Sequence, residues 1–112
     1  MIEALVLEYL NNCGLDVPVY MEVPPNAPTS FVVIQKTGSG ITNHIKSAMF
    51  SIQSYGKSMY EAAFLNEKVK DAMLDIIQLN NISRCALNSD YVYTDIANKK
   101  YRYQSVFDIV HY

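Results

Sequence analysis

The stretch SMYEAAFLNEKVKDAMLDIIQL, residues 58–79, decides the fold because it predicts the clearest helix of the chain. Its apolar residues step by three and four along one face: Ala62, Leu65, Val69, Ala72 and Ile76. Ser58 and Glu61 form a capping-box pattern at its start. Charged side chains occupy the other face. We therefore expect this helix to bury its apolar stripe against a sheet.

The segments before this helix predict a second, shorter helix and three strands. Apolar residues recur at helical spacing over residues 2–13, and Gly14 follows as a stop signal. Residues 17–21 and 31–37 are typical of strands, and the proline-rich loop between them cannot be helical. Residues 45–55 alternate apolar and polar side chains, which predicts a long strand.

Three further strands are expected after the long helix. Residues 82–87 and 91–94 read as two short strands, and residues 101–112 as a long one rich in β-forming side chains. The order α-β-β-β-α-β-β-β predicts a single α+β domain, residues 1–112, with two helices and a mixed, mainly antiparallel sheet. A chain of 112 residues has room for one modest core.

Composition narrows the classes of function. Half of the residues are apolar, which excludes a disordered tail, and the formal net charge of -2 gives no basic footprint for nucleic acid. Two cysteines are too few for a disulfide scaffold, so we expect free thiols in a reducing compartment. Glu3 and Glu8 argue against a signal peptide, and the first apolar run is too short to cross a bilayer. We expect a cytosolic protein with no membrane partner.

The sequence Gly38-Ser39-Gly40 raises the question of a phosphate-binding loop. A dinucleotide loop needs a third glycine three places later and must open a helix, but that place holds Asn43 and a strand follows. A hairpin loop explains the same residues, because glycine tolerates positive φ and Thr42 and Asn43 suit turns. We predict that the glycines lie in a projecting hairpin loop.

No catalytic or metal-binding pattern is visible in the sequence. His44 and His111 are far apart and have no metal-ligand spacing with other residues. Asp71 and Asp75 lie one helical turn apart, but lysines share their face, which favours a solvated surface. The serines of residues 45–55 lack the strand-to-helix elbow of a nucleophile. We predict no catalytic residues, no cofactor, no metal and no enzymatic activity.

The last quarter of the chain is rich in tyrosine, which suits protein interfaces, although strand propensity explains tyrosines too. Two alternatives use this region. A small ligand-binding domain or enzyme would build its site from Tyr91, Tyr93, Arg102 and His111. A nucleic-acid-binding module would use residues 99–103, where cations alternate with tyrosines. We favour a simpler explanation of those cations, a lysine-bearing hairpin turn at Asn98 that leads into a half-exposed strand, where charges also discourage edge pairing.

Three ordered phrases carry a resemblance to a known family. They are VPVYMEVPPNAPTSFVVIQKTG (residues 17–38), SAMFSIQSYGKSMYEAAFLNEKVKDAM (residues 47–73) and LNSDYVYTDIANKKYRYQSVFDIVHY (residues 87–112). In these phrases and in its size, the chain resembles the tail terminators of long-tailed phages and prophages, also called tail-completion or minor capsid proteins. The resemblance implies no catalytic residues.

The resemblance implies a subunit of a hexameric ring that caps the tail tube, ends tail polymerisation and forms part of the head–tail joint. The implied partners are further copies of the chain, the major tail-tube protein and a head-completion or connector protein, with DNA only passing through. The implied location is the virion tail, after assembly in the bacterial host cytoplasm. A ring needs two different complementary surfaces on each subunit. We expect them to include Gly38, Ser39, Gly40, Thr42, Asn43, Tyr91, Tyr93 and Arg102.

Overall fold

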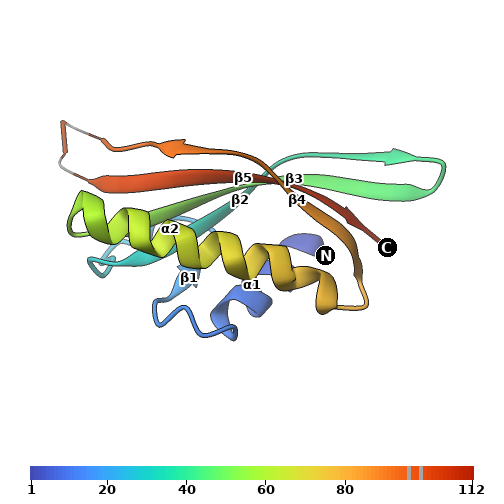
Figure 1. Cartoon of the computed structure of the whole chain (residues 1–112), viewed down its shortest axis with the longest axis horizontal. Helices are drawn as coiled ribbons and strands as arrows, with labels where there is room; N and C mark the ends of the chain where they lie inside the picture. The colour runs from blue at the N-terminus through green and yellow to red at the C-terminus, as the bar shows by residue number, and fades with distance from the viewer. Residues whose placement is uncertain (96, 99) are drawn as a thin grey trace.

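Two helices lie on one face of a five-stranded mixed sheet in the computed structural model, which describes residues 1–95, 97–98 and 100–112 (Figure 1). The elements are α1 (Ile2–Asn11), β1 (Val19–Tyr20), β2 (Phe31–Thr42), β3 (Ile45–Gly56), α2 (Met59–Leu74), the 3-10 helix η1 (Asp75–Gln78), β4 (Ile82–Val92) and β5 (Tyr101–His111). The predicted α+β class, with two helices and a mixed sheet, is confirmed.

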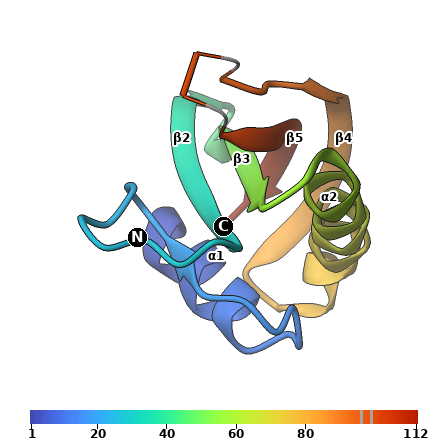
Figure 2. The ribbon, with the colours of Figure 1, turned by 90° about the vertical axis from the view of Figure 1, so that its left-hand side faces the viewer.

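The strand order in the sheet is β1-β2-β3-β5-β4. The short strand β1 runs parallel to β2, and the three other neighbouring pairs are antiparallel. Figure 2 looks along the strands and shows β2 and β4 at the two sides of the curved sheet, with β3 and β5 between them. The sheet is therefore mainly antiparallel, as the sequence predicts.

The apolar stripe of the long helix faces the sheet as predicted. Ser58 caps α2, because its Oγ accepts a hydrogen bond from the Glu61 backbone N–H at 3.2 Å. Ala62, Leu65, Val69 and Ile76 are buried, and Ala72 is half-buried. The helix ends at Leu74, and η1 continues the same chain direction to Gln78.

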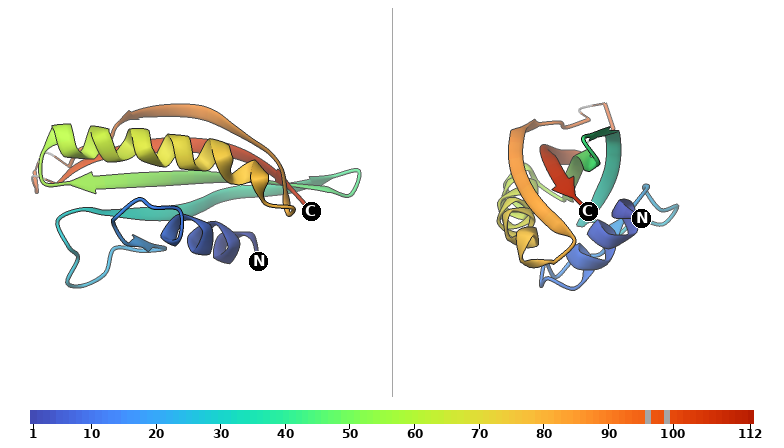
Figure 3. Two further views of the ribbon diagram at one scale, coloured as in Figure 1. Left: turned by 60° about the horizontal axis from the view of Figure 1, so that its bottom comes forward. Right: turned by 90° about the vertical axis from the view of Figure 1, so that its right-hand side faces the viewer.

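The shorter helix shares one core with the longer one. Figure 3 shows α1 and α2 on the same side of the sheet. Val6 and Leu10 of α1 belong to the same buried cluster as Val69 of α2 and Phe50 of β3. The Tyr9 hydroxyl also donates a hydrogen bond to the Ala72 carbonyl oxygen at 2.7 Å. The two helices are thus joined over the sheet by apolar packing and by one polar contact.

The two short strands expected at residues 82–87 and 91–94 are wrong, because β4 is continuous from Ile82 to Val92. The polar segment between them does not form a turn. The register against β5 instead shifts between Leu87 and Ser89, which is a β-bulge that absorbs one residue without ending the strand. The order after α2 is therefore two strands.

The glycine segment forms a hairpin, but the predicted position of its loop is wrong. Strand β2 continues through both glycines to Thr42, and the turn is Asn43–His44, with φ of 52° and 67°. Positive φ at both central residues is the sign pattern of a type I′ turn, whose twist matches that of the flanking strands. Gly38 follows a bulge in the ladder rather than a bend.

Candidate interaction site on the open sheet face

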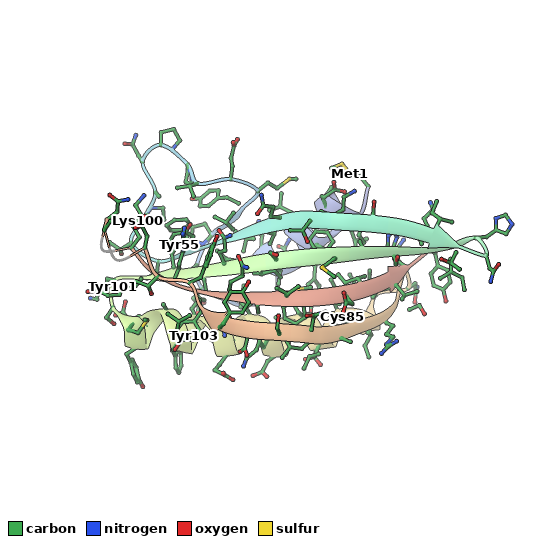
Figure 4. All side chains as sticks on the ribbon, turned by 90° about the horizontal axis from the view of Figure 1, so that it is seen from above. Met1, Tyr55, Cys85, Lys100, Tyr101 and Tyr103 are labelled. Carbon is green, nitrogen blue, oxygen red and sulfur yellow. The ribbon has the colours of Figure 1, made fainter. Side chains whose placement is uncertain are left out.

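One face of the sheet carries no helix, and Figure 4 looks onto this open face. Alternation along β3 sends Phe50 and Ile52 toward the helices and Tyr55 toward the open face. Tyr55 lies opposite Phe31 of β2 and Arg102 of β5 in the ladder. Neighbouring strands therefore bring these three side chains together on the open face.

Arg102 organises this face by binding two tyrosines. Its Nε donates a hydrogen bond to the Tyr93 carbonyl oxygen at 2.6 Å, and its Nη1 donates to the Tyr55 hydroxyl at 2.9 Å. The guanidinium carbon also lies 4.3 Å from the ring centroid of Tyr93 and 5.7 Å from that of Tyr55. Hydrogen bonds and cation–π attraction thus fix the positive charge in one position.

The aromatic rings beside Arg102 continue toward the edge of the sheet. The Phe31 and Tyr55 rings stack with centroids 4.3 Å apart and an interplanar angle of 8°, and Tyr20 meets Phe31 edge-on at 6.1 Å. The stacked rings of Phe31 and Tyr55 and the proline-rich loop after β1 border a cleft of about 400 Å³, and Lys57 forms another part of its wall. The stacked rings are buried, so they support the surface rather than form it.

A row of side-chain amides extends the network across β3, β5 and β4. Gln53 Nε2 donates to Gln104 Oε1 at 3.0 Å, and the Gln104 amide in turn donates to the Tyr91 hydroxyl. The Tyr91 and Tyr93 rings meet edge-on at 6.3 Å and are 44% and 42% exposed. We call Gln53, Tyr55, Tyr91, Tyr93, Arg102 and Gln104 the aromatic–arginine patch.

The aromatic–arginine patch is suited to binding a partner surface. Several of its polar atoms are hydrogen-bonded to one another, and it contains no cysteine, histidine or carboxylate that would act as a nucleophile, base or metal ligand. Tyrosine and arginine are the residue types that most often dominate the binding energy of interfaces, because rigid rings bury much area at low entropic cost. The patch also needs little reordering on binding, since Arg102 is already held in place.

The interface residues expected from the sequence fall into two separate surfaces. Tyr91, Tyr93 and Arg102 come together in the patch, whereas the glycines lie toward the other end of β3. In the strand ladder, Arg102 is opposite Tyr55 of β3, and Gly40 is opposite Ser47 of β3. Eight residues along β3 separate these rows, which is about 26 Å at roughly 3.3 Å per residue.

The second surface is the arm, which we define as residues 35–47 of the β2–β3 hairpin. Every residue of the arm is exposed, and its end projects beyond the helices in Figure 1. Ile41 and Ile45, near the turn, are 69% and 56% exposed. A hollow of about 280 Å³ lies beside Gly38 and Gly40, where side chains are missing, and Met49 forms part of its wall. The arm is an exposed, partly apolar element with paired strands.

The alternative ligand site at Tyr91, Tyr93, Arg102 and His111 is not assembled. Arg102 lies near one end of β5 and His111 at the other, where His111 is opposite Lys46 and Ile82. His111 is therefore separated from the patch by nearly the whole strand. The other histidine, His44, lies in the hairpin turn.

The cation stripe at residues 99–103 is only partly described, because Lys99 lies outside the described residues. Lys100 pairs with Asp95 through two backbone hydrogen bonds of 3.0 Å. Asn98 donates a side-chain hydrogen bond of 2.8 Å to the Asp95 carboxylate, and this bond holds the pKa of Asp95 below its usual range. Arg102 is engaged in the patch. A carboxylate beside the stripe weakens its attraction for phosphate.

A partly buried polar contact joins α2 to β4 on the helix-covered face. Asn66, only 1% exposed, donates from Nδ2 to Asp90 Oδ2 at 3.2 Å, and Lys70 Nζ lies 2.6 Å from the same oxygen. Lys70 also pairs with Glu67 at 2.8 Å. The hydrogen bond from Lys70 holds the pKa of Asp90 below its ordinary value. Asn66 Oδ1 is buried and has no hydrogen-bond partner within the described residues, whereas the Asp90 oxygen is bonded to both Asn66 and Lys70. Because Asp90 joins the helix to the strand, we interpret the contact as structural.

The two cysteines are unpaired and half-buried. Burial raises the pKa of Cys85 to about 11, and burial also raises the pKa of Cys13. Both thiols are therefore almost fully protonated near neutral pH and are poor nucleophiles. Within the described part of the chain, no cluster of three histidine, cysteine or acidic residues has metal-binding geometry.

Comparison with known proteins gives no match to a protein-family model or to a curated protein. Among the described residues, no helix has both the length and the apolar character needed to cross a membrane.

The sequence alone did not indicate three members of the patch, Gln53, Tyr55 and Gln104, nor the buried Phe31 that supports it. The alternation of apolar and polar residues predicted strands with two different faces, but it did not predict the order of the strands in the sheet. The row of Phe31, Tyr55 and Arg102 joins residues far apart in sequence, and its register depends on long-range pairing. The only signal in the sequence was the number of aromatic residues in and near these strands.

Proposed function

We propose that this chain is a structural subunit of a phage or prophage tail. It caps the tail tube, ends tail polymerisation and forms part of the head–tail joint, acting through binding and without turnover chemistry. The proposal starts from the resemblance of residues 17–112 to tail terminators. The physical properties of two surfaces support it.

The observation that carries the proposal is the separation of the arm from the aromatic–arginine patch. A subunit of a ring at the end of a tail must bind its ring neighbours head-to-tail and must also bind the tube or the connector, so it needs several separate surfaces. The arm is exposed and partly apolar, and the patch presents ordered tyrosine and arginine side chains. Further contacts of this kind serve the tube and the head connector.

The charge balance supports a passive role toward DNA. The net charge is -2, and the Arg102 guanidinium group is already engaged with the tyrosines of the patch. A strongly basic lining would hold the duplex through its phosphates and slow its passage. The proposed partners are therefore copies of the chain, the major tail-tube protein and a head-completion or connector protein. The proposed locations are the host cytoplasm during assembly and then the virion tail.

Complementation tests this function. A phage lacking the gene should give free heads and tails of abnormal length, and the wild-type chain supplied in trans should restore joined particles. Arg102→Ala with Tyr93→Ala should restore them poorly, whereas Tyr60→Ala, at an exposed tyrosine of α2 outside the patch, should restore them fully. A deletion phage with tails of normal length and full infectivity would contradict the proposal.

A further inference from the structure

Strand β2 has an open edge along most of its length. The short strand β1 pairs only with Val32 and Val33, so residues 35–42 have no strand beside them on that side in the described chain. The Val32 backbone N–H donates a hydrogen bond to the Pro18 carbonyl oxygen at 3.0 Å, so the backbone polar groups of Val32 point away from β3. Backbone N–H groups alternate in direction along a strand, and the bulge between Lys36 and Gly38 adds one residue to this alternation. Beyond the bulge, the N–H groups of Ser39 and Ile41 therefore point away from β3.

Strand β4 has the other open edge of the sheet. Within the described residues, β4 pairs only with β5, so the other side of its backbone faces no strand. Register shifts between Ile82 and Arg84 and between Leu87 and Ser89 leave a regular stretch, residues 84–87, between two bulges. An unpaired row of N–H and C=O groups is a template for a strand from another chain.

The two open edges have opposite chain directions. The pairs β2–β3, β3–β5 and β5–β4 are all antiparallel, so β4 runs opposite to β2. A second copy placed beside the first, with its strands in the same orientation, brings its β2 against β4 as an antiparallel pair. The contact leaves one open edge at each end, so it repeats head-to-tail and closes into a ring when the rotation permits.

The lateral register places matching parts of the two edges at the same level. Ser39 lies opposite Ala48, which lies opposite Ile109, which lies opposite Cys85. Ser39 of one copy thus comes level with the regular stretch of β4 in its neighbour. Residues of β4 beyond Ser89 would instead meet the end of β2 that β1 already covers.

The glycine at position 38 favours this pairing. Gly38 has nothing within 4 Å of the position of an added Cβ, so another backbone can approach this part of the edge closely. The charged residues of the two facing segments and of the adjoining part of the arm are Lys36, Lys46 and Arg84, and Lys36 is paired with Glu3 of α1 at 3.3 Å. The contact therefore depends on the backbone edges and not on attraction between opposite charges.

We infer that residues 35–42 of β2 in one subunit pair with residues 84–87 of β4 in the next as antiparallel strands, which continues the sheet from subunit to subunit. The inferred partner is a second copy of this chain. The inference rests on the proposed function for its ring, but it specifies which backbone edges make the contact and is tested on purified protein.

Ser39→Pro tests the contact with little effect on the subunit itself. Proline removes the N–H of Ser39, which points outward and makes no bond to β3, and the ring blocks a neighbouring strand. Ser39→Ala keeps the N–H and is the matched control. In sedimentation experiments over a range of concentrations, we expect Ser39→Pro to weaken self-association by about tenfold or more, and Ser39→Ala to leave it within about threefold.

Hydrogen exchange of the wild-type chain gives a second readout that does not depend on any variant. Assembly should slow the exchange of the Ser39 and Ile41 amides and of outward amides within residues 84–87. Three results would overturn the inference: a chain that stays monomeric throughout, assembly without slowed exchange at these amides, or equal self-association of the proline and alanine variants. Failure of complementation alone would count against the proposed phage role and would leave the edge contact standing.

Discussion

The Arg102 guanidinium group contacts Tyr93 in two ways, since its carbon lies 4.3 Å from the Tyr93 ring and its Nε donates to the Tyr93 carbonyl oxygen at 2.6 Å. These contacts connect β5 to the chain just beyond β4, where the Tyr93 backbone N–H also donates to the Arg102 carbonyl oxygen at 2.9 Å. They also hold the Tyr93 ring at the surface in one orientation. The Arg102 guanidinium group thus holds both the side chain and the backbone of Tyr93.

Replacing Arg102 should loosen this end of the sheet. Arg102→Ala removes hydrogen bonds to Tyr93 and Tyr55, and we expect a loss of about 1 to 2 kcal/mol in the free energy of unfolding. Arg102→Lys keeps the charge but not the planar fork, so it should recover less than half of the loss. Urea melts measure both variants. Equal stability of the alanine variant and the wild type would show that the contacts with Tyr93 and Tyr55 contribute nothing to the fold.

Truncation of the buried helix stripe should destabilise the domain strongly. Leu65 is buried against the sheet, so Leu65→Ala should cost about 2 to 5 kcal/mol through lost burial and a residual cavity. Leu74, at the exposed end of the same helix, provides the matched control, and Leu74→Ala should cost less than about 0.5 kcal/mol. Denaturant melts that gave equal losses for both variants would contradict the packing of α2.

The sequence predicted the parts of the fold that depend on local chemistry. The period of Leu65 and Val69 predicted the buried face of α2, and Ser58 predicted its start, because both signals act within a few residues. The bulge after Leu87 was not predictable in the same way. A polar segment is compatible with either a turn or a bulged strand, and its long-range pairing with β5 decides between them.

The candidate site was predicted in part for the same reason. Tyr91, Tyr93 and Arg102 were picked out because aromatic and basic residues cluster near the end of the chain, and they meet in the patch. Gln53 and Gln104 gave no local signal. Their contact depends on the register of β3 against β5, which the side-chain pattern of either strand alone does not specify.

Two glycines should respond in opposite ways to the same substitution. A Cβ at Gly56 would lie 2.6 Å from the Ala62 backbone nitrogen, so Gly56→Ala must push the first turn of α2 away and should cost about 1 to 3 kcal/mol. Gly38 has open space around it, and Gly38→Ala should be neutral or stabilise the strand by about 0.5 to 1 kcal/mol. Thermal melts of the two variants measure this difference. A Gly56→Ala protein as stable as wild type would contradict the close approach of α2.

Asp90 should make the stability depend on pH in the acidic range. The hydrogen bond from Lys70 holds the folded-state pKa of Asp90 below its ordinary value of 3.8. The resulting stabilisation is therefore fully present above pH 3.8 and is lost as the pH falls through the lower folded-state value. Asp90→Asn should reduce the pH dependence of urea melts between about pH 5 and about pH 2. Asp71→Asn, at an exposed carboxylate of α2, is the control.

Asp90 also provides a partner for a buried amide. Asp90→Ala leaves Asn66 Nδ2 without its hydrogen bond at a position that is 1% exposed, which should cost about 1 to 3 kcal/mol at neutral pH. The double variant Asp90→Ala with Asn66→Ala tests the coupling. If the single losses simply add, the two side chains do not act as a pair.

The arm turn should become more stable when glycine replaces His44. The turn has positive φ at both Asn43 and His44, and a side chain with a Cβ is strained in that conformation, whereas asparagine tolerates it better than most residues. An Asn-Gly pair is the preferred sequence for a type I′ turn, so His44→Gly should raise the free energy of unfolding by about 0.5 to 1 kcal/mol. His44→Val should lower it, because a β-branched residue fits positive φ least well. Urea melts of the monomer measure both changes, and the arm amides should exchange more slowly with glycine and faster with valine. If glycine were destabilising and valine neutral, the turn would lie elsewhere in the arm, and the register that brings Ser39 level with Cys85 would have to be revised.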